Sequence, residues 1–171
     1  IDPNNEQMEF ICSLSGGMYF DFTPQSKIYM NPYEIPDYVE NGDGNVRNKF
    51  IARMTSFSNS FCASVMTNIV VTRIHMNYVG RAVRTMYEEY FNETSKHAKK
   101  KKYPTLPLLR EKIKAQIDTA EFTEDKRIIM EIVDSLEHYT TGVYDMFAHA
   151  TNLDINSRLI GFGLKNIDKE I

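Results

Sequence analysis

IDPNNEQ at residues 1–7, GGMYFDF at 16–22 and YMNPYEI at 29–35 are the stretches around which the expected fold is organised. Ile1-Asp2-Pro3 is typical of the end of a buried strand followed by a turn, because proline donates no ladder hydrogen bond and holds the preceding residue extended. A natural chain seldom begins at such a point. The sequence is therefore interpreted as a piece of a longer protein.

The remainder of this stretch predicts short elements. Apolar spacing predicts an amphipathic helix over residues 5–14, which Gly16-Gly17 ends. The aromatic run 18–22 predicts a strand, and 28–30 a second extended run. A polar turn separates the two runs, so they are expected to form a hairpin before Asn31-Pro32 redirects the chain.

Helical periodicity dominates the middle of the chain. Residues 36–45 are polar and predict an exposed loop at a subdomain boundary. Apolar residues then recur every three or four positions, which places them on one face of each helix. The four expected helices cover residues 46–65, 74–91, 108–120 with Thr105 as cap, and 123–139 with Thr123 as cap.

Strand character returns after Gly142. The run 158–164 alternates bulky and small apolar residues, which indicates a buried strand whose glycines allow close backbone approach. Strands at both ends with helices between them predict a mostly helical α/β chain. The expected division places core pieces at 1–36 and 141–171 and a helical subdomain at 45–140.

Composition limits the classes of function. The chain has 171 residues, of which 42% are hydrophobic and 25% charged, and a net charge of -3, so it is not a polycation built for nucleic acid. Cys12 and Cys62 lack pairing or metal-ligand spacing and are expected to be buried thiols of a reducing compartment. No apolar run has the length of a spanning helix, and the N-terminus lacks the pattern of a signal peptide.

One cluster is strongly basic, at residues 96–102. Two interpretations remain open for its lysines. They form either a solvated loop or a diffuse positive site that contacts phosphates without reading sequence. The candidate nucleic-acid residues are Lys99, Lys100, Lys101 and Lys102.

Catalytic signatures are largely missing from the sequence. Its four histidines stand alone, without the paired spacing of a metal site. It contains no GxSxG elbow and no GxxxxGK[ST] loop. By itself the chain is therefore expected not to hydrolyse a nucleoside triphosphate, and no cofactor is expected for the segment alone.

Short blocks at both ends nevertheless share an order with a known family. These blocks are Asp2-Pro3 with Glu6, Gly16-Gly17 to Asp21, Asn31-Pro32 with Glu34-Ile35, Pro104-Thr105-Leu106, Tyr139 with Gly142, Phe147-Ala-His149, Thr151-Asn152 and Arg158-Leu159. In order and spacing they resemble the cytoplasmic traffic ATPases of conjugative type IV secretion systems, the VirB-four or TraE-type family. The match extends over almost the whole chain.

The resemblance implies a fold and a location within it. The chain would be the segment between the Walker A and Walker B motifs of a RecA-like P-loop NTPase core, with an inserted helical subdomain. The parent would bind ATP and Mg and power conjugative DNA or protein transfer or pilus assembly. It would be a cytoplasmic homo-oligomer associated with the membrane at the secretion apparatus, where its partners are other components of that system.

The resemblance also implies site residues. Asp2 and Glu6 would lie near the nucleotide of the parent, and Arg158 would contact a phosphate or a neighbouring subunit. Two positions depart from the family pattern. Ala150 replaces an arginine and Gly163 replaces an aspartate, which puts an active-site role for the C-terminal stretch in doubt. The alternative function is a helical module that binds nucleic acid or a partner protein.

Overall fold

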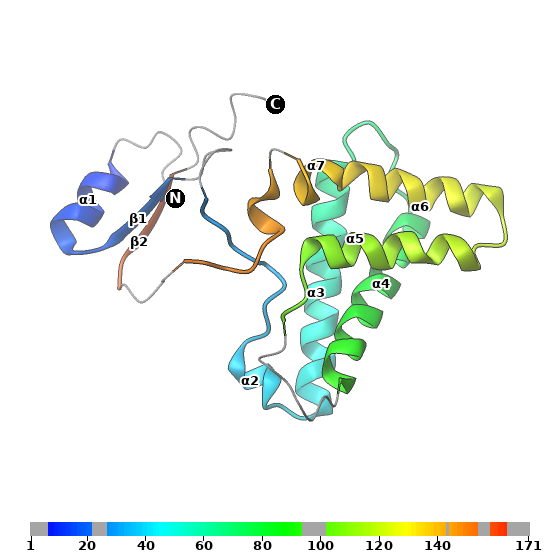
Figure 1. Cartoon of the computed structure of the whole chain (residues 1–171), viewed down its shortest axis with the longest axis horizontal. Coiled ribbons are helices and arrows are strands. Elements are labelled where there is room, and N and C mark those ends of the chain that lie inside the picture. Colours follow the sequence, from blue (N-terminus) through cyan, green and yellow to red (C-terminus); the bar gives the residue numbers. More distant parts are fainter. Residues whose placement is uncertain (1–6, 22–26, 94–101, 143, 154–157, 164–171) are drawn as a thin grey trace.

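The computed structural model describes residues 7–21, 27–93, 102–142, 144–153 and 158–163. The chain is mostly helical and contains a small parallel sheet. Figure 1 shows the sheet and one helix at one end of the molecule and the long helices gathered at the other. Two stretches of irregular backbone join the two ends.

The elements follow one another in an order that begins and ends with the sheet. They are α1 (Met8–Ser15), β1 (Met18–Asp21), α2 (Asp37–Glu40), α3 (Gly44–Val65), α4 (Arg73–Asn92), α5 (Leu106–Lys114), the 3-10 helix η1 (Ala115–Thr119), α6 (Thr123–Ser135), α7 (Glu137–Thr140), the 3-10 turn η2 (Asp145–Phe147) and β2 (Ile160–Gly163).

The sheet pairs the two ends of the chain. β1 and β2 run parallel, with Met18 opposite Ile160 and Asp21 opposite Gly163. The predicted hairpin between residues 18–22 and 28–30 is therefore wrong. Residues 28–30 form no strand, because their backbone groups bond to a segment far along the chain, as described below.

Glycines allow α1 to lie against this sheet. Gly16 ends α1 with a φ of 65°, the left-handed conformation that glycine adopts without strain. A Cβ at Gly161 would lie 2.9 Å from the Tyr19 ring and 3.0 Å from Cys12 Sγ, so α1 packs closely over β2. The expected helix is confirmed over Met8–Ser15, but only Cys12 of it is buried.

Two helical hairpins, α3 with α4 and α5 with α6, supply most of the buried core. The predicted stripes are largely confirmed, with Phe57 and Ile74 as exceptions at 41% and 46% exposure. Both lie at the margin of their stripe, where the packed face ends. The fully buried side chains of these helices include Val79, Val83, Met86, Tyr87, Leu106, Leu109, Ile113, Ile129 and Ile132.

The predicted exposed loop at residues 36–45 is confirmed only in part, since most of these residues are exposed but not all of them are loop. They contain α2, whose Val39 is fully buried in the helical core. Asp43 follows and caps α3, its Oδ1 accepting from Val46 N at 2.9 Å. Burial of one apolar side chain, Val39, holds this helical turn on the core. The polar composition of the surrounding residues gives no sign of it.

Helix boundaries differ from expectation by a few residues. Thr105 is the N-cap of α5, as predicted, but the helix starts at Leu106 and gives way to η1 at Ala115. Thr123 is the first residue of α6 rather than its cap. Among the described helices, none combines the length and apolar character needed to cross a bilayer.

Candidate functional site

Most of the predicted site residues lie outside the described residues. Asp2 and Glu6 are among them, as are Lys99, Lys100 and Lys101. Lys102 is described and exposed, just before α5. The proposed roles of these residues stay predictions.

Arg158 is described and exposed, two residues before β2. It therefore lies at the amino end of the strand. Ligands of open parallel sheets bind at the carboxyl ends, which here are marked by Asp21 and Gly163. The structure thus places Arg158 at the opposite edge of the sheet from those carboxyl ends.

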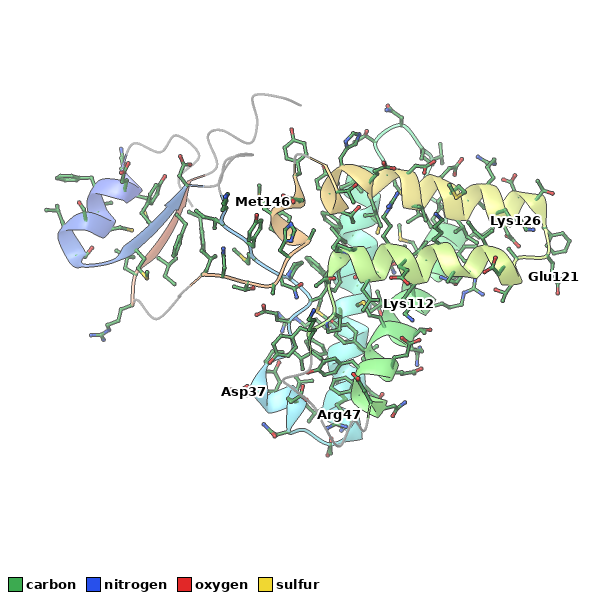
Figure 2. The ribbon with its side chains drawn as sticks, in the orientation of Figure 1. Asp37, Arg47, Lys112, Glu121, Lys126 and Met146 are labelled. Carbon is green, nitrogen blue, oxygen red and sulfur yellow. The ribbon has the colours of Figure 1, made fainter. Side chains whose placement is uncertain are left out.

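The structure does bring together the other blocks that carried the resemblance. Residues 27–35, here the first strap, run beside residues 144–153, here the second strap (Figure 1). The two straps form the junction between the sheet and the helices. In Figure 2, Met146 of the second strap lies in this junction, and its carbonyl oxygen accepts from Met30 N at 3.0 Å.

Asn31 is the centre of the junction and is 5% exposed. Its side-chain Nδ2 donates to Pro104 O at 2.8 Å, at the entrance to α5, and its Oδ1 accepts from Tyr33 N at 3.0 Å. Its backbone N donates to Thr151 Oγ1 at 2.9 Å. One buried residue thus joins three of the sequence blocks, since the first strap, the second strap and the start of α5 all meet at Asn31.

Further hydrogen bonds close the straps on each other. Tyr29 N donates to Asn152 Oδ1 at 2.8 Å, and Asn152 N donates back to Tyr29 O at 3.2 Å. Thr151 N donates to Glu34 Oε1 at 3.1 Å. Each bond spans more than a hundred residues of sequence, so the two straps meet at the base of the helical insertion that lies between them in sequence.

Tyr33 anchors the first strap in the helical core. Its ring is 1% exposed, its hydroxyl accepts from Ser58 Oγ at 3.3 Å, and its carbonyl oxygen accepts from Tyr87 Oη at 3.0 Å. Burial raises the pKa of both phenols well above the usual value, and burial raises the pKa of the neighbouring Cys62 thiol to about 12. These groups stay protonated, which suits a structural anchor rather than a nucleophile.

One acid–base pair lies on the outside of the junction. His149 Nε2 is 2.7 Å from Asp145 Oδ2, and the His149 ring packs 4.3 Å from the Tyr29 ring. His149 is 47% exposed. Within the part of the chain that the structure describes, no cluster of His, Cys, Asp or Glu side chains could hold a metal ion.

An apolar cavity of about 260 Å³ adjoins the junction. Its lining comes from the first strap, α3, α5 and the second strap, through Pro32, Tyr33, Phe57, Phe61, Leu106 and Phe147. Among the described residues, no polar atom is exposed in it. The cavity lining and the buried hydrogen bonds of the junction therefore fix the position of the straps relative to the helices.

Sequence reasoning named the blocks but missed their mutual contacts. One sequence feature could have suggested these contacts. Asn31, Pro104 and Thr151 are polar or turn-forming residues, and each lies in a different block of the same family pattern. Sequence reasoning also missed an arginine-lined groove between α3 and α4, which is described below. The signal there is the lack of Asp and Glu from Gly44 to Tyr87, which cover α3 and most of α4.

The fold and the junction define a class: a mostly helical α/β segment in which a long helical insertion separates two parallel strands. No family model and no curated protein matches the sequence. The fold is similar to a solved structure, that of VirB4 of Thermoanaerobacter pseudethanolicus, with a TM-score of 0.67 and 17% sequence identity. The similarity covers 99% of this chain and 42% of that chain, so this chain spans less than half of its structural neighbour.

Proposed function

We propose that the chain is a segment of an ATP-hydrolysing motor of a type IV secretion system. The observation that carries the proposal is the convergence of the family blocks on Asn31, in a chain whose fold matches VirB4 over nearly its whole length. Blocks that are short and separate in sequence come together in space, as a shared architecture requires.

In this proposal the segment supplies structure and the parent supplies chemistry. Residues 1–36 and 141–171 belong to the RecA-like core, and 45–140 form the helical subdomain. ATP and Mg bind to the parent, with Asp2 and Glu6 near the nucleotide and Arg158 facing a neighbouring subunit. The parent works as a homo-oligomer in the cytoplasm, at the membrane-bound secretion apparatus.

The junction then has a mechanical role. A core that rearranges as nucleotide is bound and hydrolysed would move its attached elements with it. Because the two straps are hydrogen-bonded to each other and Asn31 is bonded to the start of α5, the helices follow the core as one body. The segment alone carries no P-loop and is expected not to turn over ATP.

The coding sequence on either side of this segment tests the proposal. A GxxxxGK[ST] motif within about one helix before Ile1, and an apolar strand ending in acidic residues soon after Ile171, are the expected result. Flanks without either motif would overturn it. Purified segment should show no ATP hydrolysis above that of a mock preparation.

A further inference from the structure

Residues 44–87, which cover α3 and most of α4, carry basic but no acidic side chains; the carboxylates of α4 begin at Glu88. The whole chain has a net charge of -3, yet no Asp or Glu occurs from Gly44 to Tyr87. The basic residues of this stretch are Arg47, Lys49, Arg53, Arg73, Arg81 and Arg84. A local cationic surface on an acidic chain indicates an anionic partner.

Part of this charge lines a groove of about 490 Å³ between the two helices. Gly80 lets the helices approach, since a Cβ there would lie 3.3 Å from Thr55 Cγ2. No carboxylate is among the described residues that line the groove. The lining residues are Thr55, Asn59, Met76, Asn77, Gly80, Arg81 and Arg84.

Spacing along α4 extends the groove into a stripe. Arg73, Asn77, Arg81 and Arg84 are separated by four, four and three positions, so they share one helix face and span about 16 Å at 1.5 Å per residue. All four are exposed. The Arg81 guanidinium stacks 4.4 Å above the Tyr78 ring, which holds it in place while its edge remains available to a ligand.

The groove also has an unused hydrogen-bonding group. Asn59 Oδ1 is buried and has no hydrogen-bond partner among the described residues. Its amide lies in the groove lining beside the arginines. Because this oxygen has almost no exposed surface, a ligand in the groove would reach it only after the Asn59 side chain turns outward.

We propose that this groove and the α4 stripe bind the sugar–phosphate backbone of a nucleic acid. Arginine, asparagine and threonine are the side chains that contact phosphate oxygens most readily, and they make up most of the lining. A protein partner would need apolar or aromatic anchors at the centre, where the groove offers only Met76. Because the described lining holds no aromatic side chain on which unpaired bases could stack, the groove suits the backbone of a duplex better than a single strand.

This inference goes beyond the motor function and stands without it. Its test is fluorescence anisotropy of a labelled DNA duplex of mixed sequence, titrated with the 171-residue chain at several salt concentrations. Arg81→Gln with Arg84→Gln should weaken binding about tenfold or more and reduce the slope of log K against log salt by about two. Changing the base sequence should leave the affinity unchanged.

A matched control uses Lys49→Gln with Arg53→Gln, which removes the same charge from exposed positions of α3 outside the groove. It should weaken binding less than about threefold, through long-range attraction alone. Equal losses in the two double variants, or no binding by the wild type, would overturn the proposal. Two further results would overturn it. One is that binding is lost only in a variant with neutral residues at Lys99–Lys102. The other is that a poly-glutamate peptide at equal charge concentration displaces the DNA.

Discussion

The side-chain amide of Asn31 donates to the carbonyl oxygen of Pro104 at 2.8 Å, across 73 positions of sequence. This bond connects the first strap to the residue that leads into α5. Because Asn31 also bonds to Thr151 of the second strap, it links the start of the helical bundle to both connections with the sheet. The junction is therefore held by one buried residue and its neighbours.

Replacement of Asn31 should loosen the junction. Asn31→Ala leaves Pro104 O and Tyr33 N without their partners in a buried site, which costs about 3 kcal/mol of unfolding free energy. Chemical denaturation monitored by circular dichroism measures the loss. Asn48→Ala, at an exposed position of α3, should change stability by less than about 0.5 kcal/mol. Similar values for the two variants would show that the Asn31 bonds do not stabilise the fold.

A second prediction concerns His75, which is 3% exposed at the start of α4. Its Nδ1 accepts from Thr72 N at 3.1 Å, and its Nε2 lies 3.1 Å from Glu131 Oε2 on α6. His75→Ala removes a helix cap and the bridge to α6, so unfolding free energy should fall by about 2 kcal/mol. His138→Ala, at an exposed position of α7, is the matched control and should cost less than about 0.5 kcal/mol. Equal costs would contradict a structural role for His75.

Alkaline pH should destabilise the protein through its buried phenols. Burial raises the pKa of Tyr33 in the folded state above the value of about 10 for an unfolded chain. The stability that this contributes is complete below about pH 10 and is lost as the pH rises further, because the unfolded chain releases its proton first. Denaturant titrations from neutral to strongly alkaline pH measure the slope.

Tyr33→Phe tests that assignment. The variant should lose stability less steeply above about pH 10 than the wild type, whereas Tyr38→Phe, with Tyr38 at 65% exposure, should keep the wild-type slope. If both variants retain the full slope, Tyr33 is not the titrating group.

Thiol reactivity reports the packing of α1 on the sheet. Cys12 and Cys62 are each 1% exposed, so a thiol reagent should label neither quickly in the native protein. Gly161→Ala places a methyl group 3.0 Å from Cys12 Sγ and should open this contact, increasing the labelling rate of Cys12 by about tenfold while leaving Cys62 slow. Gly44→Ala, which has open space around it, is the control. Mass spectrometry of each labelled peptide distinguishes the two sites, and unchanged Cys12 labelling would contradict the packing.

The long helices were predictable because their apolar residues repeat with the helical period over several turns, as from Tyr78 to Tyr90 in α4. The pairing of β1 with β2 was not, since a short strand has no local signal for whether its partner is the next segment or one near the far end of the chain. α2 was missed because Val39 alone supplies its buried contact.

The candidate sites, like the fold, could be predicted from the sequence only in part. Motif order pointed to Asn31, Pro104 and Thr151, but only the folded chain places them within hydrogen-bonding distance. The search for basic function found the lysine run because its charges are consecutive. Arg81 and Arg84 were missed because the buried residues Ala82 and Val83 separate them in sequence, and the α3 residues that complete the groove lie more than twenty positions away.

ATP hydrolysis by the intact gene product tests the central claim most directly. The account predicts turnover that depends on Mg²⁺ and is lost when the P-loop lysine is replaced by alanine, with none from the 171-residue segment. Absence of turnover from an intact, folded product, or equal turnover from the segment alone, would contradict the assignment of this chain to a secretion motor.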